Sequence, residues 1–289
     1  MNEYFVGCED PFRVKELDLA MVSAYSIRNR KKPLDINRWM LDSGAFSQVV
    51  NYGDFLQDPK EYVRLCVRFQ ECGDLACVVS QDYMCEPQVI DKLKRIWGKE
   101  ASVRCHQRKT VDRYVQIKDE AQKQGLKVPI MPVLQGWEVE DYVQHFKMYE
   151  EADLLDMPTV VYHPDPYGGY FPSRRYWGQW LGIGSTCKRN QRPEVVSTIL
   201  DLLYDYWDEQ CIKAEGFRIH LFGYKQTGLK QSSIRDRIWS ADSMAPDYSH
   251  RVECREKGIP RTRRSRMDNM LKFQEKIKKQ PIQTCLTLK

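Results

Sequence analysis

Apolar runs and helix-forming stretches alternate along most of this chain, and this alternation constrains the fold more than any other feature. Short runs rich in apolar residues are typical of buried strands, whereas longer stretches with polar residues between the apolar ones are typical of surface helices. The apolar runs lie near residues 20–25, 39–41, 75–80, 128–134, 179–183, 217–222 and 238–241. The helical stretches lie near residues 59–71, 107–124, 138–149, 194–210, 226–236 and 267–279.

Strands that alternate with helices form a parallel sheet, and seven or eight repeats within about 240 residues favour closure into a barrel. A further strand is expected at 101–105 or at 155–161. An open dinucleotide-binding sheet is disfavoured because no G-x-G-x-x-G follows the first strand. The sequence therefore predicts an α/β fold, a (β/α)8 TIM-type barrel over residues 1–250, followed by a short basic helical extension over residues 251–289.

The chain is long enough to bury one large core, and its length does not call for a second full domain. It has 289 residues, of which 42% are hydrophobic. No apolar stretch reaches the roughly 18 residues of a membrane span, and the first residues do not show the basic and then apolar order of a secretory signal. We therefore expect no membrane association and a cytoplasmic location, which is the host cytoplasm if a phage carries the gene.

The ten cysteines do not form a recognisable framework. They are scattered through predicted strands and helices, so we interpret them as reduced thiols. No CxxC pair occurs, and although His250 and Cys254 have the i,i+4 spacing of a helix, no pattern supplies the further ligands that a tetrahedral site needs. The sequence therefore predicts no metal site and no cofactor.

The net charge of +5 is unevenly distributed. Between residues 251 and 280 there are eleven Lys or Arg residues and four acidic ones, and the run RTRRSR is the densest part. Such a run is either a solvated basic surface or a patch that binds phosphates by releasing counterions from a polyanion. Composition leaves both interpretations open, and the second assigns phosphate contacts to Arg261, Arg263 and Arg264.

Two further pairs of cations are candidates for phosphate contacts. Arg174 and Arg175 lie in the segment HPDPYGGYFPSRRYW, whose Pro, Gly and aromatic residues are typical of a long functional loop. Lys188 and Arg189 follow the turn GIGSTC. All four are predicted to contact nucleic acid.

Polar residues recur where the apolar runs end. In a parallel barrel all carboxyl ends of the strands open on one face, where active sites are built. A single acid in such a position is typical of a helix cap, but several acids and an amide together predict a shared pocket. The residues at these ends are Asp42, Asp82, Gln135, the Gly184–Ser185 turn, Gly223 and Asp242.

Six motifs carry a resemblance to a known family. From residue 41 to about residue 251 the chain resembles the tRNA-guanine transglycosylase superfamily, and within it is most similar to the deazapurine DNA modification protein A (DpdA) family. The DNA branch is indicated by the residues after GIGS and by the last two motifs. The motifs, in order, are LDSGAFSQ, QDYMCEP, PVLQGW, GIGSTCKRN, HLFGYK and SADSMAP.

The resemblance implies a role for each of these strand-end residues. Asp242 is the expected nucleophile and Asp42 the expected general acid/base. Asp82 and Gln135 are expected to bind the polar edge of a guanine-like base, and backbone amides near Gly184 and Ser185 to contact its carbonyl oxygen. Phe46 and Tyr83 lie near strand ends and are candidates for stacking on an extruded base.

The chemistry of these residue types is compatible with base exchange. Replacing a base at an anomeric carbon needs one carboxylate to trap the oxocarbenium-like centre and one proton shuttle for the leaving base. An ionised Asp82 accepts from N1–H and the amino group of guanine, while Gln135 donates to O6. A 7-deaza base keeps this edge, so the pocket is predicted to release guanine and admit 7-cyano-7-deazaguanine (preQ0) or a derivative.

The expected polymer is DNA. The tRNA enzymes carry a C-x-C-x-x-C…H zinc pattern after the second catalytic acid, and no such pattern follows Asp242. The nearest alternative is the same chemistry on tRNA. An inactive nucleic-acid-binding barrel and a retaining glycosidase are more distant alternatives. The intact set of Asp42, Asp82, Gln135 and Asp242 argues against the first, and the second explains two acids but not Asp82 and Gln135. The oligomeric state cannot be inferred from the sequence.

Overall fold

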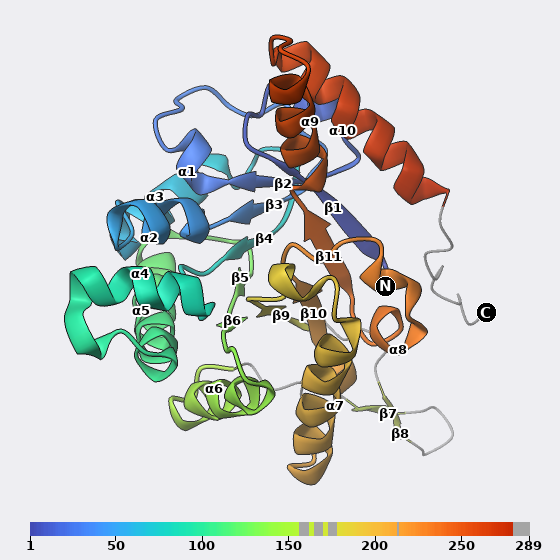
Figure 1. The fold of residues 1–289 in the computed structure, drawn as a ribbon. Coiled ribbons are helices and arrows are strands. Elements are labelled where there is room, and N and C mark those ends of the chain that lie inside the picture. The colour runs from blue at the N-terminus through green and yellow to red at the C-terminus, as the bar shows by residue number, and fades with distance from the viewer. Residues whose placement is uncertain (156–161, 165–169, 173–177, 213, 280–289) are drawn as a thin grey trace.

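The strands of the computed structural model form a ring with helices around it (Figure 1). The structure describes residues 1–155, 162–164, 170–172, 178–212 and 214–279. Within these residues the main sheet has the strand order β5-β4-β3-β2-β1-β11-β10-β9-β6, and every pairing in it is parallel. Its strands are β1 (Glu3–Cys8), β2 (Leu19–Ser23), β3 (Arg38–Asp42), β4 (Asp74–Val79), β5 (Ile130–Met131), β6 (Val133–Leu134), β9 (Gln179–Ile183), β10 (Phe217–Leu221) and β11 (Ser240–Ser243).

The barrel closes through one short segment that contributes two of these strands. β5 and β6 are interrupted only by Pro132, which has no N–H to donate to the ladder. β5 pairs with β4 at one edge of the sheet, and β6 pairs with β9 at the other. Counted as one position, this segment completes a ring of eight that follows the order of the chain, and the predicted (β/α)8 barrel is confirmed.

Helices surround the ring, as Figure 1 shows. A separate antiparallel pair joins β7 (Tyr162–Pro164) to β8 (Tyr170–Pro172). No helix in the described part of the chain combines the length and apolar character needed to cross a bilayer. The helices are α1 (Ala24–Ile27), α2 (Ala45–Tyr52), α3 (Pro59–Phe69), α4 (Pro87–Trp97), α5 (Val103–Gln124), α6 (Val139–Glu151), α7 (Pro193–Glu209), α8 (Ser232–Arg235), α9 (Ala245–Glu256) and α10 (Arg263–Lys278).

The eighth strand of the ring is not at either of the two places predicted from the sequence. β1 fills it, between β11 and β2, and its mixed sequence EYFVGC gave no clear apolar run. The strand expected at 101–105 is instead the start of α5, where the Ser102 hydroxyl accepts a hydrogen bond from the Cys105 N–H at 3.2 Å. Of the alternative range 155–161, only residue 155 lies within the described residues.

The basic extension takes part in the core. The link from β1 to β2 is short and contains only a turn of 3-10 helix, so it cannot cover β1. α10 packs there instead: the ring of Phe273 lies 6.1 Å from that of Tyr4, and Gln274 accepts from the Asp18 N–H at 2.7 Å. Met267, Met270 and Ile277 of α10 are buried in the main core. The domain boundary expected at residue 250 falls inside α9.

A buried ion cluster fixes this extension to the barrel. Asp247 in α9 is fully buried, and its two oxygens accept from the Arg261 guanidinium at 2.6 and 2.7 Å. Arg266 also donates to Asp247 and pairs with Glu9, which directly follows β1, at 2.8 Å. The expectation that Arg261 contacts phosphate is corrected here, because Asp247 and Glu9 already hold its guanidinium.

Replacing Asp247 with Asn should destabilise the fold strongly. The variant removes the buried carboxylate that two partly buried arginine side chains share and leaves them only the exposed Glu9, and breaking a buried pair in this way costs about 3 kcal/mol or more. Chemical denaturation measures the free energy of unfolding. The matched control is Asp236→Asn, whose pair with Arg235 is more exposed and is worth less than about 1 kcal/mol. Equal losses for the two variants would contradict the role given to the cluster.

Candidate active site

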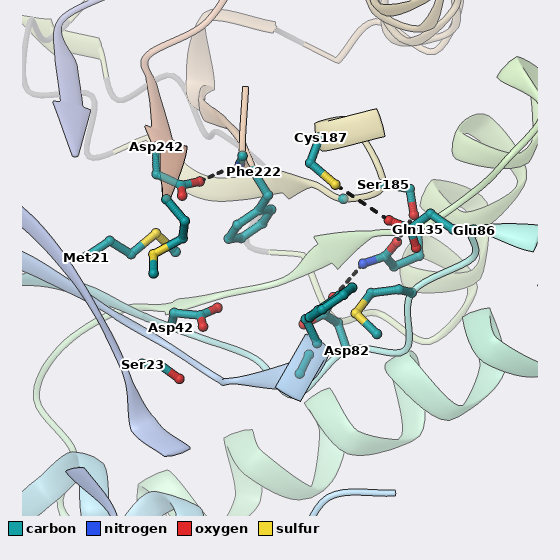
Figure 2. Close-up of a pocket in the computed structure, with 16 residues that line it drawn as sticks. Met21, Ser23, Asp42, Asp82, Glu86, Gln135, Ser185, Cys187, Phe222 and Asp242 are labelled. Atoms are coloured by element: carbon teal, nitrogen blue, oxygen red, sulfur yellow. Dashed lines mark hydrogen bonds between the residues drawn. The ribbon is translucent and has the colours of Figure 1, made fainter. Parts of the chain in front are cut away.

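A cavity of about 210 Å³ opens at the carboxyl ends of the barrel strands (Figure 2). The four side chains predicted to converge, Asp42, Asp82, Gln135 and Asp242, all line it although they come from four different strands or the residues after them. Figure 2 shows Asp42 and Asp242 on one side and Asp82 and Gln135 on the other. The lining residues are Met21, Ser23, Asp42, Ala45, Phe46, Asp82, Met84, Glu86, Gln135, Gly184, Ser185, Cys187, Phe222, Gly223, Asp242 and Met244.

A chain of hydrogen bonds joins Asp82, Gln135 and Ser185. The Gln135 Nε2 group donates to Asp82 Oδ2, and the Ser185 hydroxyl donates to Gln135 Oε1 at 2.9 Å. Ser43 donates to the other oxygen of Asp82 at 3.3 Å. Burial raises the pKa of Asp82 to about 6, although the bonds from Gln135 and Ser43 act in the opposite direction. The chain of hydrogen bonds therefore fixes which end of the Gln135 amide donates and which accepts.

Side chains of α5 and α6 hold the main chain of Gln135. Its N–H donates to His145 Nδ1 at 2.7 Å, and Gln107 Nε2 donates to its carbonyl at 2.8 Å. Burial lowers the pKa of His145 to about 3, so the ring is neutral and its Nε2–H donates to the Gln107 carbonyl at 3.2 Å. Sequence reasoning missed both residues, because a His and a Gln inside amphipathic helices gave no sign that they face a strand end.

The turn after β9 supports Gln135, but in a different way from the prediction. The Gly184 N–H donates to the Leu134 carbonyl at 2.8 Å within the barrel ladder, so it is not available to a base, and the predicted amide contact at Gly184 is wrong. A Cβ at position 184 would lie 2.2 Å from Gln135 Nε2, so only glycine allows the amide to pack there. Ser185 has a φ of +55°, an unusual conformation for a non-glycine residue, and its hydroxyl bonds Gln135.

Asp242 is held through one of its two oxygens. Oδ1 accepts from the Gly223 N–H at 2.7 Å and from His220 Nε2 at 3.3 Å. A carboxylate only accepts, so His220 Nε2 is the donor of this bond, and Nδ1 of the same ring lies 2.8 Å from the Ser240 hydroxyl. Sequence reasoning missed His220, although a histidine within the buried run of β10 is the signal that could have identified it.

Asp42 lies in an environment that favours its neutral form. Its Oδ2 accepts from the Gly44 N–H at 3.0 Å. Burial, followed by the negative charges of Asp82 and Asp242, raises the pKa of Asp42 to about 7. Near neutral pH this carboxyl group can therefore give or take a proton, which is the property that a general acid/base needs.

The aromatic residues at the site differ from those expected. Phe46 lines the cavity and is 58% exposed, whereas Tyr83 is buried and does not line it. The Tyr83 ring packs against Phe55 and Trp97, and its hydroxyl donates to Asp54 at 2.5 Å, so the stacking role predicted for it is wrong. Phe222, which the sequence analysis did not single out, lines the cavity.

The predicted phosphate-binding residues fall into three groups. Arg189 is buried, donates to the Trp137 carbonyl and lies 4.7 Å over the Trp137 ring, so it is not available to phosphate. Lys188 and Arg264 are exposed, and the exposed Arg263 pairs with Asp10, two residues after β1, at 2.7 Å. The basic run therefore begins at the same end of the barrel as the cavity. Arg174 and Arg175 lie outside the described residues.

The cysteines and histidines do not gather into a metal site in the part of the chain that the structure describes. No group of three or more His, Cys, Asp or Glu side chains there has the geometry to hold a metal ion. His250 Nε2 and Cys254 Sγ lie 3.5 Å apart without further ligands nearby. The nine described cysteines are free thiols.

The fold and the cavity together define an α/β barrel with an acid-lined pocket at the carboxyl ends of its strands. The chain belongs to the DpdA family, described as DeoxyPurine in DNA protein A, whose family model matches residues 2–162, more than half of the chain. The matched region includes Asp42, Asp82 and Gln135. No curated protein matches the chain. Family membership implies a transglycosylase-type enzyme that acts on DNA in deazapurine modification.

Replacing Asp42 with Asn should raise the melting temperature most at alkaline pH. The ordinary pKa of 3.8 rises to about 7 in the folded chain, so the folded state binds more protons at this site between these values. The free energy of unfolding therefore falls as pH rises through this window. Above the window Asp42 is ionised in the folded state, and the full loss of stability is reached. In thermal unfolding we expect the melting temperature of the variant to exceed that of the wild type most near about pH 8, and this difference to decrease as the pH is lowered to about 5. An advantage that does not change with pH would contradict this assignment.

Proposed function

We propose that this protein exchanges guanine in DNA for a 7-deazaguanine base, preQ0 or a derivative, through a covalent intermediate between Asp242 and the nucleoside. The observation that carries the proposal is the arrangement of one cavity. Two carboxyl groups, Asp42 and Asp242, line one side of it, and a hydrogen-bonded carboxylate and amide, Asp82 and Gln135, line the other. The two carboxyl groups of the first pair can act on the glycosidic bond, and the carboxylate and amide of the second pair can form hydrogen bonds with the base.

In the first step Asp242 displaces the base. Its Oδ1 is held by Gly223 and His220, so Oδ2 forms the bond to C1′ while the bond from C1′ to N9 of guanine breaks. Asp42, with its raised pKa, gives its proton to the leaving base. The products of this step are free guanine and an ester between Asp242 and the deoxyribose.

In the second step the incoming base reverses these events. Asp42, now ionised, takes the proton from N9 of the 7-deazaguanine, and N9 attacks C1′ while the Asp242 ester breaks. Asp42 is protonated again and Asp242 is ionised again, so the enzyme returns to its starting state. The two steps have the same order as in retaining glycosidases, with a base in place of water.

Asp82 and Gln135 supply the selection of guanine. Each oxygen of Asp82 has a lone pair beyond the one that Gln135 or Ser43 engages, and these accept from N1–H and the amino group of the base. The second N–H of the Gln135 amide donates to O6. Adenine reverses this pattern of donors and acceptors, and a site that leaves its buried polar groups unpaired rejects the wrong substrate by about 10⁴-fold or more.

DNA must present the guanine outside its stacked helix. Extruding a base costs a few kcal/mol, and stacking on an exposed aromatic ring at the cavity offsets part of that cost. Phe46 is placed for this contact. Lys188, Arg263 and Arg264 are exposed cations that suit contacts with the phosphates on either side.

Asp242→Asn and Asp42→Asn should affect exchange in different ways. Loss of the nucleophile should reduce incorporation of labelled guanine into a DNA oligonucleotide by at least about 10³-fold. Loss of the proton donor should slow base release by about 10²- to 10⁴-fold while DNA affinity stays near that of the wild type. Full activity of Asp242→Asn would contradict the assignment of Asp242 as the nucleophile. Label that enters tRNA and not DNA would favour the tRNA alternative.

The double variant Arg263→Ala, Arg264→Ala should weaken binding to many DNA sequences alike. Each lost phosphate contact lowers the slope of log affinity against log salt by about 0.9, so we expect the slope to fall by up to about 2. Fluorescence anisotropy over a range of salt concentrations measures it. The control is Arg95→Ala, an exposed residue in the last turn of α4, which should leave the slope unchanged. An unchanged slope in the double variant would leave the basic run as a solvated surface.

A further inference from the structure

Exposed aromatic side chains gather on one arc of the barrel. Among the described residues, the aromatic side chains with a large exposed fraction are Phe12, Phe46, Tyr52 and Tyr248, in the segments that follow β1, β3 and β11. Tyr25, two residues after β2, adds a partly exposed ring, and its hydroxyl lies 2.9 Å from that of Tyr52. Because β3, β2, β1 and β11 are consecutive neighbours in the sheet, these segments form one continuous surface, which we call the aromatic arc.

An arginine side chain lies over three of these rings. Arg251 and Arg263 also pair with Glu9 and Asp10 at 3.6 and 2.7 Å, but their side chains remain 51% and 69% exposed. Surfaces that bind unpaired nucleic acid combine aromatic faces, on which bases stack, with cations that contact the phosphates. The pairs, with the distance from the guanidinium carbon to the ring centroid, are Tyr25 and Arg28 at 3.9 Å, Phe12 and Arg263 at 5.7 Å, and Tyr248 and Arg251 at 5.8 Å.

The aromatic arc lies on the side of the cavity where the proposed exchange places the sugar. Asp42 ends β3 and Asp242 lies in β11, the two strands at the ends of the arc. Phe46 and Met244 line the cavity and are 58% and 38% exposed, so the arc is continuous with the cavity mouth. Because Asp42 and Asp242 act at C1′, the deoxyribose and the phosphates on both sides of it lie here. The DNA strand therefore leaves the cavity over the aromatic arc.

We propose that the aromatic arc binds the nucleotides next to the target guanine as unpaired bases, so that the substrate is DNA whose strands are separated around the target. This inference rests on the proposed base exchange and names the state of the DNA that the site accepts. A paired duplex keeps its bases stacked inside and presents its phosphates, which gain nothing from an aromatic face. An unpaired base can stack on Tyr248 or Phe12. The arginines beside these rings then contact the adjoining phosphates.

Fluorescence anisotropy with the full-length protein measures this preference. The probes share one guanine-containing DNA strand, used alone, annealed to its full complement, or annealed to a complement that leaves several bases on each side of the guanine unpaired. We expect the single strand and the partly unpaired duplex to bind at least about 10-fold more tightly than the paired duplex at the same salt concentration. Exchange of labelled guanine into the same three DNAs should follow the same order in kcat/KM.

Variants of Tyr248 test the contribution of the ring. The side chain is 63% exposed, so its replacement should leave the fold intact. Tyr248→Ala should weaken binding of the single strand by about 10-fold and change binding of the paired duplex by less than about 2-fold. Tyr248→Phe keeps the ring and should bind as the wild type does. The control Val115→Ala, an exposed apolar residue of α5 outside the arc, should leave all three affinities unchanged.

The outcomes separate this inference from the exchange reaction itself. Equal affinity of the wild type for the single strand and the paired duplex would overturn the role of the aromatic arc. A Tyr248→Ala variant that weakens both alike, or neither, would also overturn it. Tighter binding of an RNA strand of the same sequence would overturn the assignment of DNA as the partner. Absence of guanine exchange into all three DNAs would contradict the proposed function, whereas the affinities would still decide for or against the arc.

Discussion

The closure of the barrel at Pro132 is the constraint on which the site depends. The segment around it pairs with both edges of the sheet, and Gln135 is the first residue after its second half. Asp82 and Ser185 come after the two strands that this segment joins. The Gln135 side chain bonds both of them, so the hydrogen-bond chain of the cavity crosses the seam of the barrel. The side of the cavity formed by Asp82, Gln135 and Ser185, where we propose that the base binds, therefore forms only when the ring closes.

Crowding of acids is the second physical feature of the site, and it opposes stability. Burial raises the pKa of Asp42, Asp82 and Glu86, and the charges of Asp82 and Asp242 raise that of Asp42 further. Such an arrangement stores unfavourable free energy that a ligand with N–H donors can release. Stabilising contacts lie elsewhere, notably at the buried ion cluster around Asp247, which holds α10 over β1 where no intervening helix covers it.

Periodicity and topology could be predicted from the sequence, whereas the direction of individual side chains could not. Asp42, Asp82, Gln135 and Asp242 were predictable because each lies at the end of an apolar run, and parallel strands end on one face. Tyr83 and Arg189 also lie near such ends, but they point into the protein, which no one-dimensional pattern records. β1 was missed because its short run mixes polar and apolar residues. Glu86 also lines the cavity, and the sequence analysis did not single it out because Asp82, not Glu86, is the acid of the motif QDYMCEP that lies close to the end of an apolar run.

Mapping of a trapped protein–DNA adduct tests the central claim most directly. The enzyme is incubated with a guanine-containing oligonucleotide without an incoming 7-deazaguanine, quenched and digested, and the peptides are analysed by mass spectrometry. The account predicts one nucleotide-bearing peptide, the one that contains Asp242, together with release of free guanine. An adduct on a different residue, or guanine release without any adduct, would contradict a double displacement at this cavity.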